Sequence, residues 1–150
     1  PRMDHRGRVF PGAMDALQGL SSEAGETGVP FATLKMVELR ASQINGCSFC
    51  VEMHSRELRK AGESEERIAT VAAWREATWF SDAERAALAL TEAVTRIADR
   101  PESITDAIWA DAAEHYDEKQ LSGLLLDIGA INIWNRLNAA TRQPAGSYPT

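Results

Sequence analysis

The two cysteines of the chain, Cys47 and Cys50, form a Cys-x-x-Cys motif, and His54 follows four residues after the second. Gly46 just upstream marks a break, and residues 51–60 are rich in good helix formers. The motif is therefore predicted to lie in the first turn of a helix. Residues three apart in a helix have Cα atoms roughly 5 Å apart, a separation that a disulfide bridges. The pair can thus interconvert between dithiol and disulfide with little backbone movement.

The position of His54 on this helix decides which thiol it can serve. His54 shares a face with Cys50, and helical side chains lean toward the N-terminus, so the imidazole is expected to point at that cysteine. Cys47 lies roughly 10 Å further along the helix axis. A basic neighbour matters because a free thiol of pKa about 8.5 is only about 3% thiolate at pH 7. We therefore favour Cys50 as the base-assisted thiol and Cys47 as its partner, although the helix dipole alone favours Cys47 as the thiolate.

Charge and hydropathy limit the classes of partner. The formal net charge is −6, which argues against a nucleic-acid or anionic-membrane surface, and no apolar run approaches 18 residues. Two cysteines at redox spacing without secretory features predict a cytoplasmic protein with catalytic thiols. We expect one domain over residues 1–150, with its core at about 30–140, a flexible N-terminal arm and a flexible C-terminal tail.

Helical periodicity and capping signals divide the chain into helices, and no segment alternates as a strand does. Capping boxes begin at Ser81 and at Asp117. The stripe after Ser81 is expected to run to Ile97, and Ser103 is expected to begin the following helix. The fold class is therefore predicted to be all-α. The expected helices cover about 11–24, 31–44, 47–60, 64–73, 81–97, 103–116 and 117–141, with an aromatic-rich connection at 74–80.

The segment from Glu38 to Cys50, with His54 after it, resembles the AhpD-like alkylhydroperoxidases of the carboxymuconolactone decarboxylase superfamily. Residues 80–93 and 132–138 resemble them as well. The resemblance implies an AhpD-like helical bundle with a Cys-x-x-Cys helix, assembled as a homo-oligomer, either a trimer or a hexamer. In the peroxidase branch the second cysteine attacks the peroxide, the first resolves it, and a His–Glu relay transfers protons.

Carried over by position, these roles fall on Cys50, Cys47, His54 and Glu38. A shift of one helical turn would place the relay position on Lys35 instead. The best-known peroxidases have a histidine just before the second cysteine, where this chain has Phe49.

The leading hypothesis is a thiol-dependent peroxidase that reduces organic hydroperoxides and is recycled by an external dithiol, either a protein or a small thiol. It requires no metal, haem, flavin or other cofactor. One alternative is a decarboxylase acting on a carboxylated lactone from aromatic degradation, although such chemistry has no need of a resolving thiol. A third hypothesis is a redox-responsive oligomer with little turnover.

The same residues also have structural interpretations. Cys47 and Cys50 could be inert buried thiols or, with His54, zinc ligands, although closed zinc sites usually have four ligands. Glu38 could be a surface acid of an amphipathic helix. Three polar residues that interrupt the last apolar helix either face solvent or form a hydrogen-bonded subunit interface: Asn132, Asn135 and Arg136.

Overall fold

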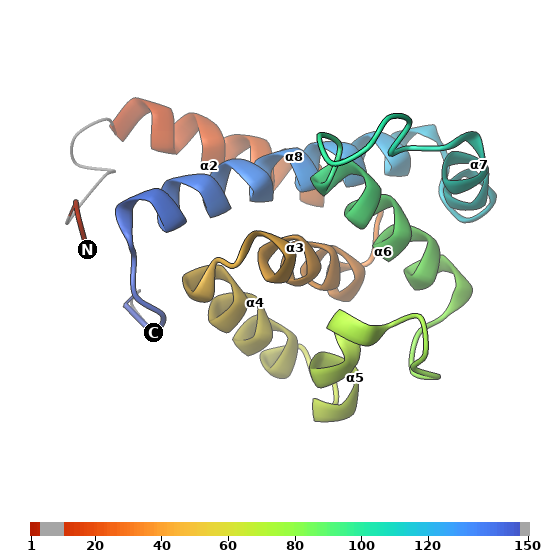
Figure 1. Cartoon of the computed structure of the whole chain (residues 1–150), viewed down its shortest axis with the longest axis horizontal. Helices are drawn as coiled ribbons and strands as arrows, with labels where there is room; N and C mark the ends of the chain where they lie inside the picture. Colours follow the sequence, from red (N-terminus) through yellow and green to blue (C-terminus); the bar gives the residue numbers. More distant parts are fainter. Residues whose placement is uncertain (4–10, 148–150) are drawn as a thin grey trace.

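The computed structural model of the chain describes residues 1–3 and 11–147, which form a bundle of α-helices (Figure 1). The described residues contain no strand, so the predicted all-α class is confirmed. No helix among them is long and apolar enough to cross a bilayer. The expectation of a flexible arm and tail falls largely on residues 4–10 and 148–150, outside the described part. The helices are α2 (Pro11–Gly25), α3 (Phe31–Asn45), α4 (Ser48–Lys60), α5 (Glu65–Thr70) followed by the 3-10 turn η1 (Val71–Ala73), α6 (Asp82–Thr95), α7 (Asp106–His115) and α8 (Glu118–Thr141).

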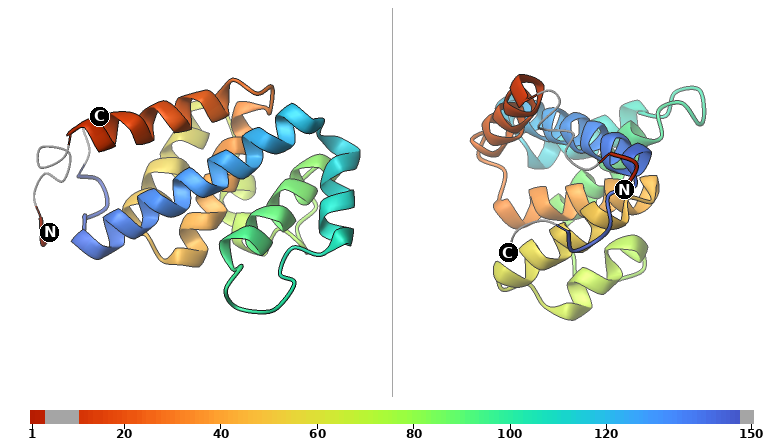
Figure 2. Two further views of the ribbon diagram at one scale, coloured as in Figure 1. Left: turned by 90° about the horizontal axis from the view of Figure 1, so that it is seen from above. Right: turned by 90° about the vertical axis from the view of Figure 1, so that its left-hand side faces the viewer.

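Helix α3 lies at the centre of the bundle, in contact with α4, α6 and α8 (Figure 1). The long helix α8 crosses α3, and α2 packs alongside α8 (Figure 2). Leu34 and Val37 join a core with α6, α7 and α8, whereas Met36 and Leu39 join a second core with α4, α5 and α6. Because apolar contacts surround α3 on several sides, the polar residues Glu38 and Ser42 of this helix are buried as well.

The capping signals in the sequence form as predicted. Ser81 and Asp117 each begin a reciprocal capping box, with Glu84 and Gln120 as the respective partners. The Ser64 side chain caps α5 by accepting a hydrogen bond from a backbone N–H. These caps satisfy backbone donors at the helix starts that have no partner within the helix.

Two helix boundaries differ from the prediction. Helix α6 ends at Thr95, and Ile97 is 61% exposed instead of packing inside. Helix α7 begins at Asp106 with Thr105 as its N-cap, not at Ser103. The hydroxyl of Ser103 is buried and donates to the carbonyl of Ala93 at 2.7 Å. Ser103 therefore satisfies a carbonyl near the end of α6 and does not begin α7.

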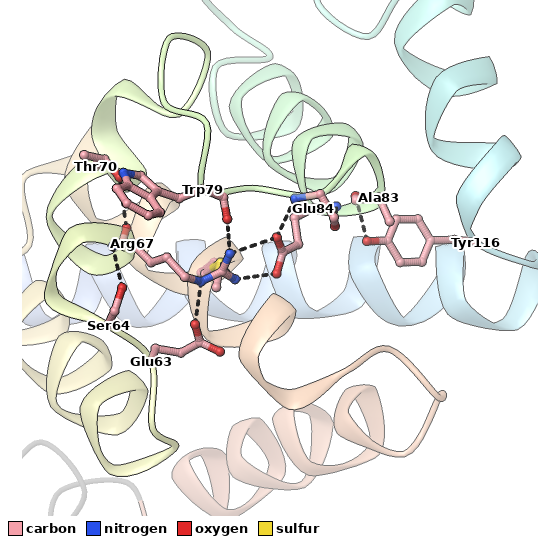
Figure 3. Close-up of polar contacts among 10 residues, drawn as sticks. Glu63, Ser64, Arg67, Thr70, Trp79, Ala83, Glu84 and Tyr116 are labelled. Atoms are coloured by element: carbon pink, nitrogen blue, oxygen red, sulfur yellow. Dashed lines mark hydrogen bonds and ion pairs between the residues drawn. The ribbon is translucent and has the colours of Figure 1, made fainter.

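The connection between η1 and α6 is held by aromatic packing and by one arginine. Trp74 and Phe80 are buried, whereas Trp79 is exposed. The guanidinium of Arg67 in α5 lies over the Phe80 ring. It also donates to the carbonyl of Trp79 and pairs with Glu84 of α6 at 2.6 Å (Figure 3). Arg67 thus fastens α5 to the start of α6.

The first residues lie against the end of α8. The backbone N–H of Arg2 donates to the carbonyl of Thr141 at 2.7 Å, and Gln143 donates to the carbonyl of Met3 at 2.8 Å. Residues 1–3 therefore contact the end of α8, whereas residues 4–10 of the expected arm lie outside the described residues.

Candidate active site

The dithiol lies at the junction between α3 and α4. Gly46 ends α3 in the left-handed conformation, with φ of 68°, which glycine adopts without a steric penalty. Cys47 follows as the N-cap of α4, and its Sγ accepts the backbone N–H of Cys50. The predicted position of the motif is confirmed. Both thiols are free and buried, and their Sγ atoms are 2.7 Å apart, so a disulfide can form without backbone rearrangement.

The close contact between the two sulfurs separates their acidities. The hydrogen bond from the Cys50 thiol lowers the pKa of Cys47 to about 7, although burial opposes this shift. The same contact, together with burial, raises the pKa of Cys50. In the resting dithiol the first negative charge therefore rests on Cys47, while Cys50 keeps the shared proton.

His54 is buried on α4 and faces two carboxylates. Its Nδ1 lies 2.9 Å from Oε2 of Glu57 and 3.2 Å from Oε2 of Glu38. Its Nε2 has no hydrogen-bond partner among the described residues, so the direct contact with Cys50 expected from the sequence is not formed. The carboxylates hold the ring by Nδ1, and this leaves Nε2 for a substrate atom or a water molecule.

Glu38 is only 7% exposed, which excludes the surface-acid interpretation. Its carboxylate pairs with Nζ of Lys35 at 2.6 Å, and Lys35 also lies 3.5 Å from Glu57. Burial opposes ionisation of Lys35, but the charges of both glutamates raise its pKa above the ordinary value. Lys35, the alternative relay position in the sequence comparison, is thus part of the same cluster as Glu38.

A third carboxyl group, from Asp127 of α8, reaches this cluster. Burial and the neighbouring charge of Glu38 raise the pKa of Asp127 to about 8, against the lowering effect of Lys35. Its Oδ2 is buried without a hydrogen-bond partner among the described residues. Asp127 therefore holds a proton at neutral pH beside Glu38.

Glu38, His54 and Glu57 could also hold a metal ion, since their ligand atoms all lie within 4.8 Å of one another. The ammonium of Lys35 already contacts both carboxylates, and it supplies the positive charge that a cation would bring. This donor set therefore fits proton transfer better than a closed metal site.

Three asparagines of α8 lie along the junction of α3 and α4. Asn135 is fully buried, donates to the Ser42 hydroxyl at 3.0 Å and accepts from Asn45 at 2.9 Å. Asn132 accepts from Asn45 at 3.0 Å. Asn138 donates to Sγ of Cys50 at 3.2 Å. Asn135 is fully buried within the chain, so the solvent-face interpretation is wrong for this residue. Asn132 is only half-buried, and its role at a subunit interface stays a prediction.

Cys50 and His54 line one cavity, which has a volume of about 300 Å³. Apolar side chains of α4 and α8 form much of its wall, and the Lys35 cluster forms its polar end. Cys47 does not line this cavity. The other lining residues are Gln18, Ser21, Lys35, Glu38, Phe49, Met53, Glu57, Ile131, Trp134 and Asn138.

The sequence predicted four of the site residues, which are Glu38, Cys47, Cys50 and His54. Glu57, Asp127 and Asn138 were not predicted. Glu57 lies three residues after His54 on the same helical face, a local signal that was available. Asp127 and Asn138 interrupt the apolar pattern of α8, but the pattern does not indicate what they contact.

Comparison with known proteins agrees with this geometry. The profile of the Carboxymuconolactone decarboxylase family matches residues 11–93. The uncharacterized protein YdfG of Bacillus subtilis is 36% identical over 139 residues, 93% of each chain. The alkyl hydroperoxide reductase AhpD of Nocardia farcinica is 39% identical over 67 residues, 43% of this chain and 37% of that one. A crystal structure from Agrobacterium tumefaciens, of a protein of unknown function proposed to be an AhpD antioxidant defence protein, has a TM-score of 0.90 and 33% identity, covering 98% of this chain and 99% of that chain.

This chain, an all-helical bundle with a buried dithiol at a helix start, has the AhpD-like fold. The chain belongs to the carboxymuconolactone decarboxylase family. The resemblance seen in residues 38–54 is confirmed.

Proposed function

We propose that the protein is a thiol-dependent peroxidase that reduces organic hydroperoxides. The observation that carries the proposal is the dithiol, with Sγ atoms 2.7 Å apart, of which Cys50 shares a cavity with His54. The apolar wall formed by Phe49, Met53 and Trp134 suits the organic part of a hydroperoxide. The AhpD names of a relative and of a structural neighbour support the reaction class.

In the first step the proton that the two sulfurs share moves from Cys50 to Cys47. The Cys50 thiolate attacks the terminal oxygen of the hydroperoxide, and the O–O bond breaks. Cys50 becomes a sulfenic acid, and the organic fragment leaves as an alkoxide that needs a proton. His54 is placed to deliver it through Nε2, with Nδ1 held by Glu57 and Glu38.

In the second step the Cys47 sulfur attacks the sulfenic acid of Cys50. A disulfide forms, and the hydroxyl leaves as water once it has taken a proton. An external dithiol then reduces the disulfide by thiol exchange and becomes a disulfide itself. The balance is one hydroperoxide and one dithiol consumed, with one alcohol, one water and one disulfide formed.

The charged cluster behind His54 prepares the site for this proton transfer. Lys35 balances the negative charge of Glu38 and Glu57, and Asp127 stores a proton next to Glu38. The carboxylates stabilise positive charge on the imidazole when the ring takes up a proton. We assign Glu38 and Glu57 as positioning residues, because they act on the substrate through His54.

A coupled assay with cumene hydroperoxide and dithiothreitol tests the proposal. The wild-type protein should consume peroxide only when the dithiol is present, and Cys50→Ser should abolish turnover. In Cys47→Ser the sulfenic acid should accumulate on Cys50, where dimedone traps it and mass spectrometry locates it. Trapping on Cys47 would reverse the two roles, and the absence of dithiol-dependent consumption would refute the peroxidase.

The name of the matching family keeps a decarboxylase as the second candidate. This candidate predicts release of CO₂ from a carboxylated lactone that survives Cys47→Ser, since proton chemistry does not need a resolving thiol. A redox-responsive oligomer would form the Cys47–Cys50 disulfide with peroxide but would show little turnover. Peroxide consumption in the coupled assay, together with CO₂ release from a carboxylated lactone, distinguishes the peroxidase, the decarboxylase and the redox-responsive oligomer.

A further inference from the structure

The dithiol stands between two cavities. Cys50 lines the cavity that contains His54, whereas Cys47 lines a second cavity of about 340 Å³ beyond the N-terminus of α4. Asn138 lines both cavities. The two sulfurs and Asn138 therefore separate the two spaces. The other residues of the second cavity are Gly46, Ser48, Ala139, Arg142, Gln143 and Pro144.

The two cavities differ in chemical character. The first combines an apolar wall, including Phe49 and Trp134, with the Lys35 cluster, whose ammonium is already paired with two carboxylates. In the second, Arg142 is the one positively charged side chain among the described lining residues. Asn138 is 3% exposed, and its Oδ1 has no hydrogen-bond partner among the described residues. Since Nδ2 already donates to Cys50, Oδ1 is the atom of Asn138 that a polar ligand could engage.

We propose that the second cavity is the binding site for the reductant, and that a dithiol carrying a carboxylate enters there and attacks Cys47. Arg142 would bind the carboxylate, and Asn138 would accept a hydrogen bond from the second thiol of the reductant, which is still protonated when the first attacks as a thiolate. Hydroperoxide and reductant would thus reach the two sulfurs from different cavities. The inference deepens the proposed function and rests on its thiol–disulfide cycle.

The exchange chemistry agrees with this direction of entry. An incoming thiolate bonds to Sγ of Cys47, the Cys47–Cys50 bond breaks, and its electron pair passes to Cys50. The Cys50 thiolate receives the hydrogen bond from Asn138 and takes a proton in the His54 cavity. The second thiol of the reductant then attacks the reductant sulfur bonded to Cys47. Cys47 leaves as the thiolate that the N–H of Cys50 stabilises. The reductant ends as a disulfide and the protein as a dithiol.

Two exposed alanines in the last turn of α8 provide a matched test. Ala139 lines the second cavity, and its neighbour Ala140 lines neither cavity. Ala139→Trp should slow reduction of the disulfide by dithiothreitol at least about tenfold while leaving oxidation by cumene hydroperoxide unchanged. Ala140→Trp should change neither rate. Equal reduction rates in both variants, or slowing of the peroxide step alone by Ala139→Trp, would overturn the inference.

A pair of reductants tests the predicted charge recognition. Arg142→Gln should slow reduction by dimercaptosuccinate, a dithiol with two carboxylates, about five- to tenfold, with little change for the neutral dithiothreitol. An equal effect on both dithiols would overturn the role of Arg142. The disulfide can also be formed with diamide instead of peroxide. Reduction can therefore be measured even if the proposed peroxidase activity fails, and the two failures are distinguishable.

Discussion

The carboxylate of Glu57 lies 2.9 Å from Nδ1 of His54, one turn further along the same helix. Glu57→Gln removes a charge that stabilises a protonated imidazole. We expect the rate of disulfide formation by cumene hydroperoxide to fall about tenfold, since a positioned acid–base group contributes roughly 10²–10⁴-fold and Glu38 remains. Stopped-flow tryptophan fluorescence can follow the reaction. Glu52→Gln, on the same helix and paired with Arg56, is the control, and equal rates in the two variants would contradict the assigned role of Glu57.

The low pKa of Cys47 depends on the second thiol. The hydrogen bond from Cys50 lowers the pKa of Cys47 to about 7 because it stabilises the thiolate. Cys50→Ala removes this donor, so the pKa of Cys47 should rise toward the ordinary value of about 8.5. The pH dependence of alkylation by iodoacetamide measures the midpoint. A midpoint that stays near 7 in the variant would show that the helix start alone sets the acidity.

Asp127 should make stability fall as the pH rises. In the unfolded chain an aspartate ionises near a pKa of about 3.9, whereas the folded protein holds this proton up to about pH 8. Unfolding therefore releases a proton between these values, so this stabilising contribution is lost as the pH rises through that window. The side chain of Asp127→Asn cannot ionise. Between about pH 5 and pH 9 the free energy of unfolding of this variant should therefore fall less than that of the wild-type protein, the difference exceeding about 1 kcal/mol.

Urea denaturation at the two pH values measures this difference. The exposed Asp111 provides the control variant, Asp111→Asn. If Asp127→Asn and the wild-type protein lost stability in parallel, Asp127 would not be the carboxyl that retains its proton.

The buried amide of Asn135 should contribute strongly to stability. Asn135→Ala removes the N–H that the buried Ser42 hydroxyl accepts, which costs about 1–3 kcal/mol, and it also removes one of the two acceptors of the Asn45 amide. Arg136 is exposed and donates to Asn132 on its own helix, so Arg136→Ala should change the free energy of unfolding by less than about 0.5 kcal/mol. Similar urea midpoints for the two variants would contradict this difference.

Assembly into a trimer or hexamer remains a prediction. Ile133 and Leu126 of α8 are 45% and 42% exposed, and Ile97 lies with Ile133 on one shallow hollow. An apolar surface of this kind favours a protein contact. Light scattering at micromolar concentration should show at least a trimer, and Ile133→Glu should lower the mass. A monomeric wild-type protein would contradict the prediction, and Ala110→Glu on the exposed side of α7 is the control.

The features that depend on neighbours within about one helical turn could be predicted from the sequence. These features join residues that are three or four positions apart in the chain. They are the helix end at the glycine before Cys47, the contact between the two cysteines, and the caps at Ser81 and Asp117. Glu57 belongs to this group as well, because its partner His54 lies one turn away. Such contacts follow from helix geometry, whatever the rest of the chain does.

The contacts of the polar residues of α8 could not be predicted in this way, because they depend on how distant segments pack. Asn138 and Cys50 are 88 positions apart, and Asn135 and Asn45 are 90 apart. An asparagine in an apolar helix has the same sequence pattern whether its partner is water, another subunit or a buried thiol, because an amide can hydrogen-bond to any of them. The crossing of α8 over α3 and α4 places these amides, and the Asp127 carboxyl, beside the dithiol and its proton relay.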